Sequence, residues 1–307
     1  MNRVRIATRK SQLALWQAYY VRERLNELYK QLNVELVEIV SEGDKTLDVP
    51  LSQVGGKGLF LKELEQSLLS DNADIAVHSM KDVTVTLPEG LMIAAICPRE
   101  DPRDAFVSNR YDSIEELPAG AVVGSCSLRR RCQILAAFPH LKVKNLRGNV
   151  NTRLKRLDNG DYDALILAAA GLIRLDLKSR IRQYLDVEIS LPAVGQGAVG
   201  IECRADNEQM IRLLEPLIDR EATLRVEAER AANQRLGGGC HVPVAVFAEI
   251  EADRMTVRGL VGELDGSQIL RATASGARQD ASVLGVNVAN QLIEQGAQRI
   301  LDSVYAS

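Results

Sequence analysis

An apolar, strand-like segment of this 307-residue sequence ends in side chains that could do acid-base chemistry. Ala76–His78 runs directly into Ser79, Lys81 and Asp82. Open α/β sheets bind ligands at the carboxyl ends of their strands, where a fixed carboxylate can stabilise developing positive charge or transfer a proton. The alternative is that Lys81 and Asp82 are only solvent-exposed side chains of a loop. Composition alone does not decide between a ligand site and such a loop.

A second candidate site lies at a strand-to-helix junction. The segment Gly124–Arg131 passes through small hydroxyl residues, including Ser127, into Arg129 and Arg130. Backbone N–H groups at a helix start, hydroxyls and guanidinium groups together bind carboxylates well. We expect an anion here, with a solvated basic helix start as the alternative.

The same arrangement recurs one unit later, in Leu146–Arg153. Arg147 and Gly148 precede the predicted helix, and Arg153 lies within it. From residue 129 to residue 180 there are eight arginines and four lysines against four aspartates, a local net charge of +8 in a chain of net charge −3. Such segregated positive charge indicates an anionic partner, either a nucleic acid or a small polycarboxylate.

A cysteine in a glycine-rich turn is the fourth candidate. Cys240 follows Gly237–Gly239, where the permissive backbone leaves its side chain uncrowded. The carboxyl end of the preceding helix disfavours a thiolate, so activation would have to come from elsewhere. The alternative for any single cysteine is a small buried hydrophobe.

Composition excludes several classes of function. The five cysteines form no CxxC pair and the three histidines are not spaced for zinc, so we expect neither structural metal nor disulfides. Aromatic residues make up 4% of the chain and do not interleave with the arginines, which argues against nucleic acid. The absence of a membrane-length apolar run and of a signal-peptide core predicts a cytosolic protein with no membrane partner.

The elements that must position these residues follow an α/β pattern. The first hundred residues alternate β-like and helical periodicity, which predicts a parallel sheet. In order, the elements are a strand at Arg3–Thr8, a helix from Leu13 to Leu28, a strand at Val34–Val40, a helix from Lys57 to Leu69 and a strand at Asp74–His78.

A second series of this kind and a different third region follow. The second series has strands at Ala121–Gly124, Leu141–Leu146 and Ala164–Ala168, with helices from Leu128 to Phe138 and Val150 to Leu157. Leu191–Cys203 interrupts the pattern and is typical of a hinge with a returning strand. The third region has a helix ending at Leu236, strands near Val244–Ile250, Met255–Leu264 and Ile269–Ala274, and a final helical stripe from Leu284 to Ile293.

Taken together, these segments resemble the porphobilinogen deaminase family over nearly the whole chain. The matching motifs are Arg5–Arg9, Leu13–Gln17, Val54–Phe60, His78–Val83, Arg99–Phe106, Leu191–Gly197 and Gly238–Cys240. The resemblance implies two α/β domains like type II periplasmic binding proteins plus a small C-terminal α+β domain. The expected ranges are 1–97 with 198–215 for domain 1, 103–191 for domain 2 and 220–307 for domain 3.

The resemblance also implies roles for individual residues. Cys240 matches the cysteine that carries a dipyrromethane cofactor through a thioether, and Asp82 matches the catalytic aspartate. Matching positions for the cofactor are Ser79, Lys81, Ser127, Arg129, Arg130, Arg147 and Gly148. Matching positions for the substrate are Arg9, Ser11, Arg147, Arg153 and Arg174.

The implied activity is that of a transferase of tetrapyrrole and haem biosynthesis, which needs no metal. Four porphobilinogen molecules would be joined to the dipyrromethane primer with loss of ammonia, and hydrolysis would release hydroxymethylbilane. A monomer is the family-based expectation. The rival interpretation is a non-enzymatic, two-lobed anion-binding or ligand-sensing protein, since fold does not fix function; it gives Cys240 no role.

Several positions depart from the family pattern. They are Lys10 and Gln12 beside the first motif, Gln53, Thr84, Cys126 and His241. None of them removes a proposed catalytic group. Gln53 weakens the case for a basic lid residue at that position.

Overall fold

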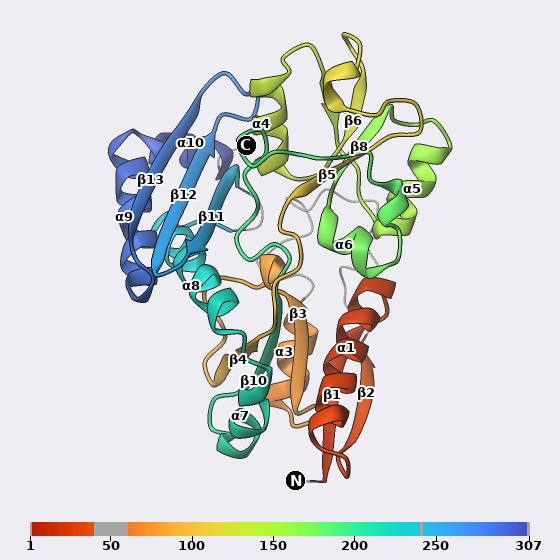
Figure 1. Cartoon of the computed structure of the whole chain (residues 1–307), viewed down its shortest axis with the longest axis vertical. Coiled ribbons are helices and arrows are strands. Elements are labelled where there is room, and N and C mark those ends of the chain that lie inside the picture. Colours follow the sequence, from red (N-terminus) through yellow and green to blue (C-terminus); the bar gives the residue numbers. More distant parts are fainter. Residues whose placement is uncertain (1, 40–60, 240–241, 306–307) are drawn as a thin grey trace. The chain divides into compact units, whose positions relative to one another are not determined.

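The computed structural model describes residues 2–39, 61–239 and 242–305 (Figure 1). The chain divides into two compact units, each of which is described by itself. The first comprises Met1–Arg99 with Ala198–Thr223, and the second comprises Glu100–Gly197 with Leu224–Ser307. No helix among the described residues has the length and apolar character needed to span a membrane.

The first unit contains a five-stranded sheet of order β2-β1-β3-β10-β4. The strands are β1 (Arg3–Arg9), β2 (Asn33–Ile39), β3 (Ile75–Ser79), β4 (Leu91–Ile96) and β10 (Val199–Arg204). The helices are α1 (Gln12–Leu28), α3 (Lys62–Leu69) and α7 (Glu208–Leu214). Alternating strand residues pack on opposite faces: Val4 and Ile6 lie in one apolar cluster with α1, whereas Ala7 and Ala76 lie in another with α3.

The three strands predicted to form a parallel sheet, β1, β2 and β3, are parallel, but the first sheet also contains a strand of the opposite direction. β1 pairs with β2 and β3 in parallel, but β10 runs antiparallel between β3 and β4. β10 is the returning strand expected after Leu191, and it enters the sheet from the second half of the chain. Its reversed direction depends on where the chain re-enters, which periodicity does not encode.

The second unit has a similar five-stranded sheet, of order β7-β6-β8-β5-β9. Its strands are β5 (Asp104–Val107), β6 (Val122–Gly124), β7 (Lys142–Lys144), β8 (Ala164–Ala168) and β9 (Gln183–Tyr184), with helices α4 (Leu128–Ala137), α5 (Val150–Asp158) and α6 (Ala169–Arg174). The predicted strands β6, β7 and β8 are parallel, whereas β5 pairs antiparallel with both β8 and β9. The sequence interpretation did not assign β4, β5 or β9 as strands.

A small antiparallel sheet of order β11-β12-β13 completes the second unit. It comprises β11 (Val244–Glu251), β12 (Arg254–Gly262) and β13 (Ile269–Ala277), with helices α8 (Arg220–Arg235), α9 (Ala281–Glu294) and α10 (Ala297–Tyr305). One sheet face packs on these helices, and the other packs on Cys132 of α4. Gly285 permits a close contact between α9 and α8, since an added Cβ would lie 2.1 Å from the Ala228 carbonyl oxygen. The fold class is therefore α/β with a C-terminal α+β part, as predicted, and each α/β part contains a five-stranded sheet.

Candidate active site

Asp82 lies just beyond the carboxyl end of β3. The strand is buried up to His78, and a short 3₁₀ turn, Met80–Asp82, follows Ser79. Met80 is 1% exposed and its N–H donates to the Ala198 carbonyl at 3.0 Å, which anchors the turn. A buried anchor at Met80 leaves Asp82 on the exposed side of the turn.

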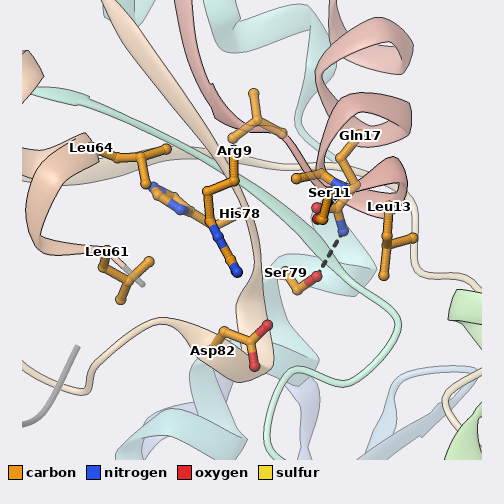
Figure 2. A pocket seen from close by; sticks show the side chains of 11 residues that line it. Arg9, Ser11, Leu13, Gln17, Leu61, Leu64, His78, Ser79 and Asp82 are labelled. Atoms are coloured by element: carbon orange, nitrogen blue, oxygen red, sulfur yellow. Dashed lines mark hydrogen bonds between the residues drawn. The ribbon is translucent and has the colours of Figure 1, made fainter. Parts of the chain in front are cut away.

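A pocket opens beside Asp82, and all its lining residues belong to the first unit (Figure 2). Its polar lining residues are Arg9, Ser11, Gln17, His78, Ser79 and Asp82, and Leu13, Leu61 and Leu64 are among the apolar ones. Figure 2 shows the Ser79 hydroxyl directed toward the Gln17 side chain, with the Asp82 carboxylate nearby. The pocket thus combines an anionic group with a cationic one.

Strand pairing explains why residues so distant in sequence meet here. β1 and β3 are parallel neighbours, so Arg9 and Ser79 come from adjacent strand ends. Ser11 begins α1 as its N-cap, and its side chain accepts the Ala14 N–H at 3.3 Å. From the same helix, Gln17 donates to the Ser79 hydroxyl at 2.7 Å.

The pocket residue His78 belongs to a buried acid-base pair that the sequence interpretation missed. His78 Nε2 is 2.8 Å from Glu202 Oε2 on β10, and both side chains are almost completely buried. Burial raises the pKa of the neighbouring Glu65, and the negative charge of Glu202 raises it further. The signal in the sequence was a glutamate within the apolar run Val199–Cys203.

In the second unit, α4 begins at the predicted anion-binding junction. Ser127 is the N-cap, and its side chain accepts the Arg130 N–H at 3.4 Å. Arg129 and Arg130 follow in the first turn, but they are only 4% and 6% exposed. Both pair with Asp104, which is 0% exposed. The sequence predicted that these guanidinium groups bind an anion, with a solvated helix start as the alternative. The structure shows both of them buried and paired with a carboxylate of the protein itself.

The second junction is built around α5. Asn149 is its N-cap, and Gly148 has φ of 108°, a value that side-chain-bearing residues rarely adopt. Arg153 turns back from the helix and donates from Nε to the Gly148 carbonyl at 2.7 Å. Its Nη2 is 3.7 Å from the Cys126 sulfur, so this junction also contacts the loop before α4.

The remaining predicted residues are more scattered. Arg147 directly precedes Gly148 and is partly exposed, as is Lys81 beside Asp82. Arg174 ends α6 and donates from Nη2 to the Gly197 carbonyl at 2.8 Å. Cys240 lies outside the described residues, as do Gln53, His241 and the motif Val54–Phe60, so their predicted roles stay predictions.

The structure therefore groups the predicted residues within each unit. Arg9, Ser11, Ser79 and Asp82 share one pocket in the first unit. In the second unit, Ser127, Arg129 and Arg130 share one helix start, and Gly148 and Arg153 share another. No cluster of three or more potential metal-binding side chains occurs among the described residues.

The solved structures to which this chain is similar include several proteins named for a ligand that they bind. A methionine-binding lipoprotein from Bacillus subtilis is 14% identical, with a TM-score of 0.45 over 72% of this chain and 92% of that chain. The methionine-binding protein MetQ is 15% identical, with a TM-score of 0.46 over 76% and 94%. The aliphatic sulphonate-binding protein SsuA from Escherichia coli is 12% identical, with a TM-score of 0.42 over 76% and 70%. Similarity at this level says nothing about what this chain binds.

Family models match both parts of the sequence. The model of the dipyrromethane cofactor-binding domain of porphobilinogen deaminase matches residues 4–212, and that of the C-terminal domain of the same enzyme matches residues 223–294. These matches do not favour the non-enzymatic alternative. The chain belongs to the porphobilinogen deaminase (hydroxymethylbilane synthase) family of tetrapyrrole-biosynthesis transferases, whose cofactor is dipyrromethane.

Proposed function

We propose that the chain joins four porphobilinogen molecules, with release of ammonia, to a dipyrromethane held by Cys240, and that hydrolysis then releases hydroxymethylbilane. The observation that carries this proposal is the pocket in which Asp82 lies with Arg9 and Ser11. Porphobilinogen has a pyrrole N–H, an aminomethyl group, an acetate and a propionate. The pocket offers a carboxylate for the first two and cationic or hydroxyl donors for the others.

The residues at the two helix starts fit a pyrrole cofactor with carboxylate side chains. Ser127 and Asn149 begin α4 and α5, and helix N-termini favour anionic groups. Arg147, Arg153 and Lys81 add positive charge, as such a cofactor requires. Bound dipyrromethane would supply the nucleophilic α-carbon to which pyrrole units are added.

Asp82 would act as the electrostatic partner of the reacting substrate. Its carboxylate would accept the pyrrole N–H as the bond to the aminomethyl nitrogen breaks and ammonia leaves with the electron pair. The resulting azafulvenium cation shares its charge with the pyrrole nitrogen, so a fixed carboxylate would lower its energy. After the new carbon–carbon bond forms, Asp82 would remove the α-proton, which the released ammonia can accept.

The other assignments follow the division between primer and incoming substrate. Ser79, Lys81, Ser127, Arg129, Arg130 and Gly148 would serve mainly the cofactor, whereas Arg9, Ser11, Arg153 and Arg174 would serve mainly the substrate. Arg147 would serve both. Arginine suits this task because its planar fork of donors matches a carboxylate.

We also propose a division into three domains at the expected boundaries. Residues 1–97 with 198–215 would carry the catalytic aspartate, 103–191 the arginines and 220–307 the cofactor cysteine. Support comes from the separate five-stranded sheets and the separate three-stranded sheet. A cytosolic location and a monomeric state remain predictions of the sequence.

Intact mass spectrometry of the purified protein tests the cofactor assignment. The parent should carry an adduct equal in mass to two linked pyrrole units, and Cys240→Ala should lack it. Cys126→Ala is the matched control, because Cys126 is a partly exposed thiol outside the proposed attachment point. It should keep the adduct.

Two results would contradict the proposal. A folded parent that stays unmodified after incubation with porphobilinogen would rule out the covalent primer. An adduct that persists in Cys240→Ala would place the attachment at another residue.

A further inference from the structure

Asp104 is the first residue of β5, and its carboxylate is fully buried. Four side chains donate hydrogen bonds to it. Arg130 donates to Oδ1 from Nε at 3.0 Å and from Nη2 at 2.7 Å. Arg129 Nη1 is 2.9 Å from Oδ2, Ser190 donates to Oδ2 at 2.7 Å, and Gln196 donates to Oδ1 at 2.9 Å. All of these residues belong to the second unit.

The cluster combines two guanidinium groups with one carboxylate, so it carries a net positive charge. Burial alone would raise the pKa of Asp104, but the charges and hydrogen bonds of Arg129 and Arg130 hold it well below its usual range. The carboxylate therefore stays ionised. It separates two like charges that would otherwise repel each other in a medium of low dielectric constant.

Backbone contacts fix both arginines in single orientations. Arg129 donates from Nη1 to the Leu191 carbonyl at 2.6 Å, and Arg130 donates from Nη1 to the Ile166 carbonyl at 3.1 Å. Gln196, which bonds Asp104, also donates to the Pro102 carbonyl at 2.6 Å. The cluster thus joins the first turn of α4 to the middle of β8, to the start of β5 and to the Leu191–Gln196 segment.

We propose that Asp104 is a positioning residue of the cofactor site, which holds Arg129 and Arg130 as one rigid, net-cationic unit at the N-terminus of α4. The proposal rests on the proposed role of these arginines as partners of the cofactor carboxylates. A buried positive charge in the first helical turn adds to the field of the helix N-terminus. Asp104 touches neither cofactor nor substrate, and it acts through the two arginines.

The test compares Asp104→Asn with Gln133→Met. Asp104→Asn keeps the size of the side chain but removes its charge. Gln133 lies in the same buried region of α4, and its described hydrogen bonds go to backbone groups of Arg129 and Leu191. Its replacement therefore perturbs the packing without removing the charge that pairs the arginines.

The primary readout is the rate at which cofactor-free protein acquires the dipyrromethane adduct from porphobilinogen. It is followed by intact mass at a temperature where circular dichroism shows every variant folded. We expect Asp104→Asn to load about 10²-fold more slowly than the parent, the size of effect that misplaced binding groups produce. Gln133→Met should lose thermal stability but load at close to the parental rate.

A second readout separates positioning from general destabilisation. In the fraction of Asp104→Asn that has been loaded, the KM for porphobilinogen should match that of the parent, because the proposed substrate residues lie elsewhere. Equal loading by folded Asp104→Asn and parent would overturn the proposal. Equally slow loading by both variants would also overturn it, since the role would then be structural.

If Asp104→Asn does not fold, Ser190→Ala takes its place. This change removes one hydrogen bond to the carboxylate and leaves its charge. Loading should slow severalfold, and an unchanged rate would count against the proposal. The proposed function fails separately, because the results that contradict it concern the parent and Cys240→Ala, not Asp104→Asn, Ser190→Ala or Gln133→Met.

Discussion

Two aspartates, each next to a strand end, have opposite environments in this protein. Asp82 follows β3 on an exposed turn beside a pocket, whereas Asp104 begins β5 and is 0% exposed. Asp104 is bonded by two arginines, a serine and a glutamine. The pocket beside Asp82 has a single arginine, Arg9, in its lining.

The difference shows that burial decides whether a carboxylate can react with a substrate or can only hold neighbouring side chains in place. An exposed carboxylate in a pocket can approach a substrate and exchange protons with it. A carboxylate surrounded by buried guanidinium groups cannot do so, but it fixes those groups in place. Changes at Asp82 should therefore affect mainly rate, and changes at Asp104 mainly stability and cofactor loading.

The largest effect is expected from Asp82→Asn. The amide keeps the shape of the side chain but stabilises the substrate cation less and cannot take up the α-proton. We expect kcat to fall by about 10³-fold, the upper range for loss of one electrostatic group. The melting temperature should stay close to that of the parent, because Asp82 is exposed. Steady-state kinetics and calorimetry measure both; retained kcat would remove Asp82 from the mechanism.

Asp104→Asn, unlike Asp82→Asn, should strongly lower the stability of the protein. Removing one partner of a buried ion cluster leaves unpaired charge, so the free energy of unfolding should fall by about 3–5 kcal/mol. Chemical denaturation at neutral pH measures this loss. A change below about 1 kcal/mol would mean that the arginines can re-form their contacts without the carboxylate.

The pH dependence of stability sharpens the same comparison. The folded-state pKa of Asp104 is lowered, so its stabilising contribution is fully present above the unfolded-state pKa of about 4. Below that pH the unfolded state takes up a proton that the folded state does not, and the contribution declines. The difference in the free energy of unfolding between the parent and Asp104→Asn should therefore decrease below about pH 4. It should stay constant from about pH 6 to 8. A difference that is independent of pH would contradict the assignment of Asp104 as an ionised carboxylate with a lowered pKa.

Arg147→Leu tests whether the basic region of the second unit binds the growing chain. Loss of a charge-assisted hydrogen bond to a carboxylate costs about 1.5–3 kcal/mol, which corresponds to roughly 10–10²-fold in rate. Elongation should stall, with bound intermediates accumulating on the protein. Mass spectrometry during turnover would detect them. Normal turnover in this variant would contradict the proposed role of Arg147.

The smallest effects are expected from the two serine N-caps. Ser127→Ala removes the cap of α4 and Ser11→Ala removes the cap of α1, each at a cost of about 1 kcal/mol of stability. Ser11 also lines the pocket beside Asp82, so Ser11→Ala should additionally raise the KM for porphobilinogen. Ser127→Ala should slow cofactor loading instead. Equal KM values for Ser11→Ala and the parent would remove Ser11 from the substrate site.

Local sequence patterns predicted the elements that carry the site. Apolar periodicity identified β1, β3 and β6, and the junctions after β6 and before α5 were recognised from hydroxyl, glycine and arginine residues. The short strands β5 and β9 were missed, since β9 comprises only Gln183–Tyr184 and β5 only Asp104–Val107. The antiparallel direction of β10 was also missed, because it depends on long-range pairing.

The sequence by itself determined the α/β class, the excess of positive charge between residues 129 and 180, the family resemblance and the expected roles of Asp82 and Cys240. Only the tertiary structure decided which of these charges are buried and what they pair with. Arg129 lies 25 residues from Asp104 along the chain, and His78 lies 124 residues from Glu202. Such pairs form when separate strands and helices pack together, and no local pattern of residues encodes that packing.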